Sequence, residues 1–419
     1  MELLSPAGNI EKLEYAWEYG ADAVYIGLKN FSLRAKADNF CSDEYKHIAR
    51  LKDEYKTKGI EKRLYCALNI SFNNSDIKAL LEQLEYFTSY PIDAFIIQDM
   101  GIIKIISKYF PRAHLHLSTQ ANCLNSEACK VYRDLGFSRI VLAREASLKD
   151  IEEIKKDAKD IEIECFVHGA MCIAYSGRCL VSAYLAKRSA NKGLCTHSCR
   201  WNYKLYKKEA FEHEWACEED ERRGEYFEIE EGDAYTAMFS SKDLCMIDYL
   251  KNFRDIGVDA IKIEGRMKSL YYTAIATQAY RKKLDFLDGK ISYDEAKPFI
   301  EELYNISNRV LGTGFYFDRD EADKTVSGRP SSPYRLVGLI GKKIADNEWE
   351  LILRNKLTKN EELEYIGAGI KAIKDTTYSL LDLDTKENLE WSSQGHKTII
   401  KTNIALEEGF IVRKKEMSL

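Results

Sequence analysis

Short runs of apolar residues recur along the first 270 residues, and a stretch with helical spacing follows all but one of them. The runs are rich in Val and Ile, which is typical of buried parallel strands. The eight predicted strands are Glu2–Leu4, Ala23–Leu28, Leu64–Ile70, Ala94–Gln98, His114–Ser118, Arg139–Ala143, Ile161–His168 and Ala260–Glu264. The predicted helices are Ile10–Tyr19, Asp43–Lys56, Ser75–Phe87, Gly101–Tyr109, Ser126–Leu135, Leu148–Lys155 and Leu270–Phe286.

This alternation predicts an α/β fold, a closed (β/α)8 barrel of the TIM type. An open doubly wound sheet would show the same alternation. However, no glycine-rich dinucleotide loop follows the first predicted strand. We therefore expect the barrel.

The rhythm breaks between the seventh and eighth predicted strands for about ninety residues, far more than an ordinary connection. This interval contains most of a cysteine-rich stretch, 164–201, and then a polar, acidic segment, 204–233, that we expect to be an exposed insertion or hairpin. An extra strand is predicted at Ala234–Ser240, and a short helix is predicted to begin within Ser240–Leu244.

The pattern changes again after residue 290. Tyr293–Asn305 is a predicted helix, and from Arg335 to Leu419 the apolar runs alternate as in short antiparallel strands. At 419 residues the chain is too long for one ordinary core. The expected organisation is a barrel domain at 1–290, a helix and linker at 291–334, and a small all-β domain, a barrel or sandwich, at 335–419.

Four of the eleven cysteines, Cys172, Cys179, Cys195 and Cys199, are separated by six, fifteen and three residues. A disulfide framework needs an oxidising compartment. Structural zinc usually takes two short knuckles, and only the last two of these cysteines form one. An iron-sulfur cluster also takes four thiolates and tolerates irregular spacing. The spacing favours an iron-sulfur cluster, and a zinc site and incidental thiols stay as alternatives.

Composition narrows the class of protein. No window of eighteen apolar residues exists, so no membrane span is expected, and the opening MELLSPAG lacks the features of a signal peptide. We therefore expect a cytoplasmic protein with reduced thiols. The net charge of −5 argues against coating nucleic acid by bulk charge. A local basic flank, or alternatively a solvated charged face, is formed by Lys187, Arg188, Lys192, Arg200, Lys204, Lys207 and Lys208.

Working residues of such barrels lie where the strands end. This rule places the cysteines after the seventh strand, which ends near His168, and Glu264 and Arg266 after the eighth. Arg266 is the candidate for binding a carboxylate or phosphate, unless it pairs with a glutamate of the rim. His168 is a candidate base or donor to a ligand sulfur, unless it is a buried histidine bonded to the backbone. Other residues expected at the mouth are Asn69, Gln98, Asp99, His116, Gln120, Arg144 and Glu145.

From Glu164 to Ser182 the residues follow the order E-x-F-x-x-G-A-M-C-x-x-x-x-G-x-C-x-V-S. This order resembles the signature of the collagenase-like peptidase family, also called peptidase family U-32. The segments GLCTHSCRW (193–201), MELLSPAGN (1–9) and IKIEGRMKS (261–269) are similar to the same family, so the resemblance runs from residue 1 to about residue 320.

The resemblance implies a barrel-like catalytic domain and two classes of activity. Some family members hydroxylate RNA bases or quinone precursors without dioxygen, which implies a 4Fe-4S cluster on Cys172, Cys179, Cys195 and Cys199. Cys245 is an alternative fourth ligand, because members vary at the last cysteine. In the branch that acts on the wobble uridine of tRNA, prephenate is the implied source of the hydroxyl group. The implied partners are then the tRNA anticodon loop, a small anionic co-substrate and an electron-donor protein.

The family name implies a peptidase instead. Neither an H-E-x-x-H zinc motif nor a G-x-S-x-G nucleophile elbow occurs in the chain. A Cys/His pair could still act as nucleophile and base. The quinone branch is less expected, since its members resemble a barrel without the appended β domain.

Overall fold

The computed structural model divides the chain into two compact units, Met1–Thr273 with Arg309–Pro330, and Ala274–Asn308 with Ser331–Leu419. The structure describes residues 1–28, 31, 40, 43–172, 174–179, 182, 190, 195, 216–218, 226–228, 230–232, 235–237, 242–307, 309–317 and 332–416.

The first unit is built on a closed parallel barrel of eight described strands, as predicted. The strands are β1 (Glu2–Pro6), β2 (Ala23–Ile26), β3 (Arg63–Leu68), β4 (Ala94–Ile97), β5 (His114–Leu117), β6 (Arg139–Val141), β7 (Glu162–Ala170) and β13 (Ala260–Ile263). Neighbours along the chain pair from β1 to β7, and β13 closes the ring by pairing with both β7 and β1.

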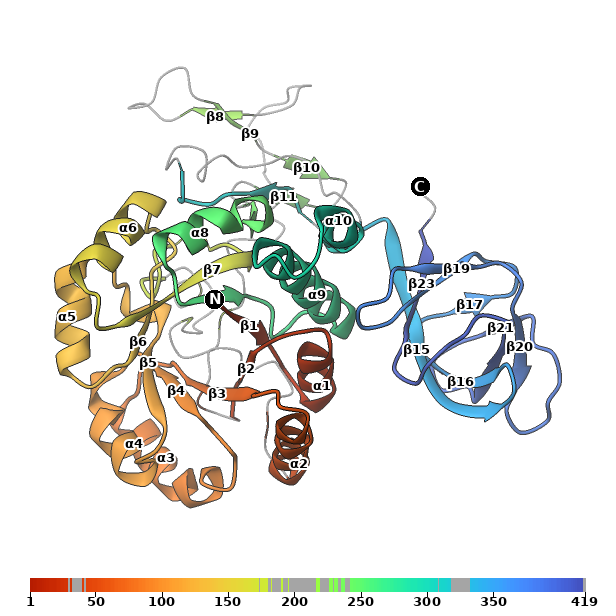
Figure 1. Cartoon of the computed structure of the whole chain (residues 1–419), viewed down its shortest axis with the longest axis horizontal. Coiled ribbons are helices and arrows are strands. Elements are labelled where there is room, and N and C mark those ends of the chain that lie inside the picture. Colours follow the sequence, from red (N-terminus) through yellow and green to blue (C-terminus); the bar gives the residue numbers. More distant parts are fainter. Residues whose placement is uncertain are drawn as a thin grey trace, which may run out of the picture. The chain divides into compact units, whose positions relative to one another are not determined.

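Helices surround the barrel (Figure 1). They are α1 (Ile10–Glu18), α2 (Glu44–Thr57), α3 (Asn74–Phe87), α4 (Ile103–Tyr109), α5 (Ser126–Asp134), α6 (Leu148–Asp157) and α8 (Leu250–Ile256). Helix α9 (Leu270–Leu287) begins in the first unit, and most of it belongs to the second. The described part of the first unit also has short 3-10 turns. They are η1 (Met100–Ile102) before α4, η2 (Thr119–Ala121) after β5 and η5 (Ile247–Tyr249) before α8. No described helix has the length and apolar character that crossing a bilayer requires.

The prediction that a helix begins within Ser240–Leu244 is wrong. Asp243–Cys245 forms strand β12, which pairs antiparallel with Ala170–His168 of β7, and α8 begins only at Leu250. The physical reason is that strand β6 leaves the end of β7 without a partner on one edge. Strand β6 ends at Val141, opposite Glu164, so the backbone groups at the end of β7 need another partner. A two-residue strand, β14 (Leu311–Gly312), then pairs with β12.

Four short strands belong to the long interval after β7. Strands β8 (Ala216–Glu218) and β9 (Tyr226–Glu228) pair antiparallel, as do β10 (Glu230–Gly232) and β11 (Tyr235–Ala237). The second pair includes part of the extra strand that the sequence predicts at Ala234–Ser240.

The second unit contains α10 (Tyr293–Glu302), η6 (Leu303–Ile306) and an antiparallel half-barrel. Its described strands are β15 (Tyr334–Ala345), β16 (Glu348–Leu353), β17 (Leu357–Thr358), β18 (Leu363–Ile366), β19 (Ile373–Asp375), β20 (Ser379–Asp382), β21 (Trp391–Ser392), β22 (Thr398–Lys401) and β23 (Ile411–Lys415). The order in the main sheet is β19-β18-β23-β15-β16-β22-β20, and β17 pairs with β21. The small all-β fold that the sequence predicts is confirmed.

A buried arginine joins α10 to this sheet. Arg413 of β23 is 1% exposed; it binds Glu302 of α10 at 2.5 and 2.7 Å and Glu364 of β18 at 2.5 and 2.8 Å. Its guanidinium also lies 3.7 Å from the ring centroid of Tyr334. Because a buried charge must be paired, this cluster makes the helix part of the β unit.

Replacing Arg413 by Met should destabilise the second unit by about 3 kcal/mol or more, because two carboxylates lose their buried partner. The control is Arg335→Met, which removes an exposed ion pair with Glu416 and should cost no more than about 1 kcal/mol. Urea unfolding of the full chain measures both. Equal losses for the two variants would contradict the role of Arg413.

A candidate active site at the barrel mouth

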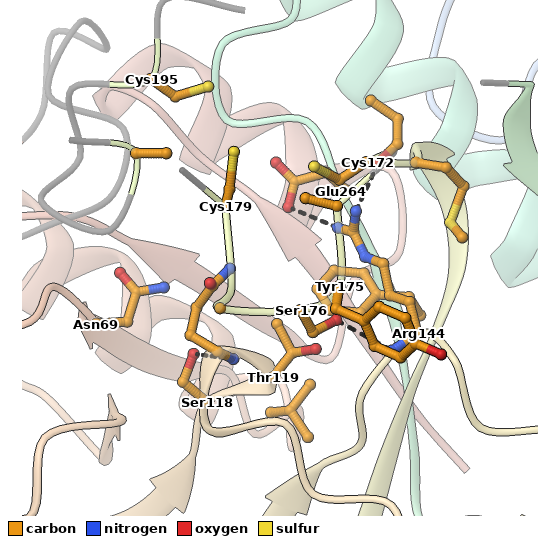
Figure 2. A pocket seen from close by; sticks show the side chains of 18 of the residues that line it. Asn69, Ser118, Thr119, Arg144, Cys172, Tyr175, Ser176, Cys179, Cys195 and Glu264 are labelled. Carbon is orange, nitrogen blue, oxygen red and sulfur yellow. Dashed lines mark hydrogen bonds and ion pairs between the residues drawn. The ribbon is translucent and has the colours of Figure 1, made fainter. Parts of the chain in front are cut away.

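A cavity of about 160 Å³ lies at the carboxyl ends of the barrel strands (Figure 2). The described residues that line it come from β2 to β7, β13 and the loops that follow them, as the barrel rule predicts. Those with polar or aromatic side chains are Tyr25, Asn69, Ser118, Thr119, Gln120, Arg144, Glu145, Phe166, Cys172, Tyr175, Ser176, Cys179, Ser182, Cys195, Lys262, Glu264 and Arg266.

Three cations and two aromatic rings form one wall of this cavity, which we call the cationic wall: Arg144, Phe166, Lys262, Tyr25 and Arg266. The Arg144 guanidinium lies 4.2 Å from the centroid of Phe166, and the Lys262 ammonium lies 5.5 Å from it. The same ammonium lies 4.5 Å from the centroid of Tyr25, and the Arg266 guanidinium lies 5.7 Å from it. The cations therefore alternate with ring faces, which attract positive charge.

Arg144 ties three strand ends together. It donates one hydrogen bond to the carbonyl oxygen of Ala170 at 2.7 Å and lies 3.5 Å from the carboxylate of Glu264. The sequence left open whether Arg266 binds an anionic ligand or pairs with a rim glutamate, Glu264 or Glu145. In the structure Arg144 pairs with Glu264, and Arg266 is buried beside Tyr25.

Buried ion pairs continue from the cationic wall into the barrel interior. Lys262 donates to Glu164 at 2.8 Å, and the other oxygen of Glu164 lies 3.3 Å from Arg139. Arg139 also binds Glu2 at 2.5 Å and Glu162 at 2.8 Å. Burial lowers the pKa of Lys262, and the Glu164 carboxylate opposes part of that shift. We call this chain of groups the charged column.

The segment that follows β7, residues 171–179, which we call the cysteine loop, packs onto the barrel mouth through Gly177. This residue has φ +75°, and a Cβ atom there would lie 2.0 Å from the carbonyl oxygen of Gln120. The neighbouring Ser176 donates its N–H to Glu145 at 2.8 Å and accepts the N–H of Arg144 at 3.3 Å. These contacts fix the loop between the ends of β5 and β6.

Cys172, Cys179 and Cys195 line the cavity, while Cys199 lies outside the described residues. Figure 2 shows these three cysteines bordering the same space as Glu264 and Arg144. In the described part of the chain, no three His, Cys, Asp or Glu side chains lie close enough together to hold one metal ion. The donor set is nevertheless the soft, thiolate-rich kind that iron-sulfur clusters and zinc take.

His168 does not line the cavity. It is buried on β7, and its ring stacks on Tyr272 with centroids 5.7 Å apart. Burial and, to a lesser degree, Lys268 lower its pKa to about 3, so the imidazole is neutral near pH 7. Cys245, opposite His168 on β12, is likewise absent from the cavity lining. The catalytic role of His168 stays a prediction.

The other residues expected at the mouth divide into three groups. Four of them line the cavity: Asn69, Gln120, Arg144 and Glu145. Gln98 contacts Ser71, and Asp99 caps η1. His116 faces a second cavity, at the amino ends of the strands, together with Arg139. The basic flank from Lys187 to Lys208 lies outside the described residues.

Sequence reasoning missed Lys262, Glu164, Tyr25, Phe166 and Tyr175. A signal existed for the first two, because a lysine within AIKIE and a glutamate within IECF interrupt runs that otherwise read as apolar strands. That the side chains of Lys262 and Glu164 point into the barrel follows only once the strands are known to close into a ring.

Fold and site together define a (β/α)8-barrel protein with a cysteine-lined cavity at its mouth. The sequence model of Peptidase family U32 matches residues 8–326, and the chain belongs to this family.

Three relatives illustrate the range of names in the family. "tRNA hydroxylation protein P1" of Bacillus subtilis is 36% identical over 92% of this chain and 88% of its own length. "Uncharacterized protease MJ0090" of Methanocaldococcus jannaschii is 34% identical over 98% of this chain and 97% of its own length. "Collagenase" of Porphyromonas gingivalis is 28% identical over 75% and 73%.

Replacing Gly177 by Ala should displace the cysteine loop, since the new Cβ overlaps the Gln120 carbonyl oxygen. Gly59→Ala is the matched control, with φ +73° but nothing within 4 Å of the new Cβ. The control should lose only the roughly 1–2 kcal/mol of left-handed strain. Thermal unfolding and the alkylation rates of Cys172 and Cys179 distinguish the two. Identical behaviour of both variants would show that the contact does not matter.

Proposed function

We propose that this chain hydroxylates a base of RNA, the wobble uridine of tRNA, without dioxygen. The observation that carries the proposal is one cavity that combines three cysteine thiols with the cationic wall. Relatives named as tRNA hydroxylation proteins support the substrate class. The finer parts of the proposal, namely the wobble position, the cluster and prephenate, rest on the resemblance noted in the sequence.

The cysteines would hold a 4Fe-4S cluster, with Cys172, Cys179, Cys195 and Cys199 as ligands. They fit because three of the four are unbridged thiols on one cavity. The chemistry that such a group supplies when bound is one-electron transfer, so an electron-donor or acceptor protein is an expected partner. Zinc is the alternative occupant of the same thiols.

The remaining lining residues suit the two other participants. Hydroxylation replaces a C–H bond of the base by C–OH, a two-electron oxidation, so an oxygen donor and an acceptor of two electrons are both needed besides the RNA. Arg266 and Arg144 line the cavity and would bind an anionic donor, for which prephenate is the expectation.

Tyr175 lines the cavity and is 59% exposed, so a base splayed out of an anticodon loop could stack on its ring. Asn69 and Gln120 carry amides that can pair with a pyrimidine edge. We propose that the second unit positions the RNA.

A peptidase is the competing function, given the relatives named collagenase and protease. Among the described residues that line the cavity there is no histidine, and buried His168 and His116 lie elsewhere. A cysteine nucleophile would therefore lack a histidine base among the described lining residues. The cavity favours the RNA reaction.

Nucleoside mass spectrometry of tRNA tests the proposed function. A strain without this gene should lose the hydroxyl-derived modification of wobble uridines, and the wild-type gene should restore it. Cys172→Ala should fail to restore it, whereas Cys66→Ala, a change in the buried core of β3, should succeed. Unchanged wobble uridines in the deletion strain would end the proposal.

Iron content tests the ligand set separately. Anaerobically purified Cys172→Ala, Cys179→Ala, Cys195→Ala and Cys199→Ala should each lose iron, because each removes a thiolate. Cys245→Ala should keep it. The assignment of Cys199 is wrong if Cys199→Ala keeps full iron while Cys245→Ala loses it.

A further inference from the structure

A pair of buried thiols lies outside the lining of the mouth cavity. Cys123 follows η2, and Cys129 is on the buried side of α5. Their sulfur atoms are 3.5 Å apart, and the side chains are 1% and 0% exposed. Two further buried cysteines, Cys66 of β3 and Cys165 of β7, have no sulfur contact of this kind among the described residues. The contact distinguishes the pair from cysteines that only fill the core.

The local backbone turns the chain so that these two thiols meet. Asn122 is left-handed, with φ 56°, a conformation that Asn adopts more readily than most residues. The side chain of Asn125 then accepts the N–H of Ala128 at 2.9 Å and caps the start of α5. Because Cys129 lies only six residues after Cys123, one turn and one helix start are enough to bring the sulfurs together.

The contact makes one thiol of the pair easier to ionise. The hydrogen bond from Cys129 lowers the pKa of Cys123, although burial opposes this shift, whereas the same bond and burial raise the pKa of Cys129. For comparison, burial raises the pKa of Cys66 to about 12. Since the thiolate is the nucleophile in thiol oxidation, Cys123 suits the attacking role and Cys129 the resolving role. A small oxidant reaches these buried thiols when the loop after η2 opens locally.

We propose that Cys123 and Cys129 form a redox-active dithiol that hydrogen peroxide converts to a disulfide. The Cys123 thiolate attacks one oxygen of the peroxide, which gives a sulfenic acid and a hydroxide ion, and this ion takes up the proton that Cys123 lost. The sulfur of Cys129 then displaces the hydroxyl group, which closes the S–S bond and releases water with the Cys129 proton. In total, two thiols and one peroxide become one disulfide and two waters, and two electrons pass from sulfur to oxygen.

The disulfide would also act on the mouth cavity, because the backbone around Cys123 touches two of its borders. The carbonyl oxygen of Cys123 accepts the N–H of Ala143 at 3.0 Å, next to Arg144. Gln120 of η2 lines the cavity, and Gly177 packs against its carbonyl oxygen. A disulfide bond is about 2.0 Å long, so the two sulfurs must approach by roughly 1.5 Å. We expect the loop to shift with them and to draw the Cys123 carbonyl away from Ala143.

Peptide mapping tests the pair, because trypsin releases both cysteines in one peptide, residues 113–130, that contains no other cysteine. The full chain, purified without oxygen, is treated with hydrogen peroxide, unfolded, labelled with N-ethylmaleimide and digested. This peptide should become two hydrogens lighter and lose both labels, and dithiothreitol should restore them. Burial raises the pKa of Cys66 and of Cys165. These two cysteines should therefore react about tenfold or more slowly, since each unit of pKa changes the thiolate fraction about tenfold.

Two variants separate the roles of the thiols. Cys129→Ala removes the resolving thiol, so Cys123 should stop at the sulfenic acid, which dimedone labels. Cys165→Ala is the matched control, a buried cysteine without a sulfur partner among the described residues, and should form the disulfide as the wild type does. The wild-type measurement needs no variant and decides the question even if Cys129→Ala does not fold. A wild-type peptide that keeps both labels, or that loses them no faster than Cys66 and Cys165 lose theirs, overturns the redox pair.

Hydrogen–deuterium exchange tests the connection to the cavity. Peroxide treatment should speed exchange at the Ala143 N–H of the wild-type protein but not of Cys129→Ala, which cannot form the disulfide and so controls for damage elsewhere. Equal changes in the two proteins would overturn the connection.

The inference goes beyond the proposed function and does not rest on it. None of these measurements involves RNA, so unchanged wobble uridines in the deletion strain would end the proposed function and leave the disulfide standing. Conversely, a peptide that keeps both labels removes the redox pair and leaves the RNA reaction untouched.

Discussion

Glu164, without exposure to solvent, lies between Lys262 and Arg139, and the cavity depends on this arrangement. TIM-type barrels are usually filled by layers of branched apolar side chains. Here a chain of ion pairs occupies part of the interior. Each buried charge is tolerable only because its neighbours pair with it, so changing one member disturbs the rest.

The charged column ends at the cationic wall, and residues of the cysteine loop line the same cavity. The loop sits there because Gly177 leaves room for the Gln120 carbonyl and because Glu145 binds the backbone of Ser176. Thiols and cations thus border one small space although they come from three separate parts of the sequence, with Arg144 before the cysteines and Lys262 and Arg266 well after them. That arrangement suits a reaction in which electron transfer and an anionic reactant meet at one base.

The fold could be predicted from the sequence because β1 to β7 and β13 are apolar runs separated by amphipathic helices. The position of the cysteines after the seventh strand likewise placed them at the barrel mouth, where Cys172, Cys179 and Cys195 line the cavity. Lys262 and Glu164 were not predicted, because a single charge within an apolar run shows its direction only once the ring closes. Strand β12 was mistaken for a helix because its pairing depends on the free edge of β7, which is a tertiary feature.

The most direct test of this account is the iron and acid-labile sulfide content of the wild-type protein purified without oxygen. The account predicts a coloured protein with about four iron and four sulfide per chain, as thiolate-bound clusters of this kind contain. A colourless protein without iron or sulfide that cleaves denatured collagen would contradict it.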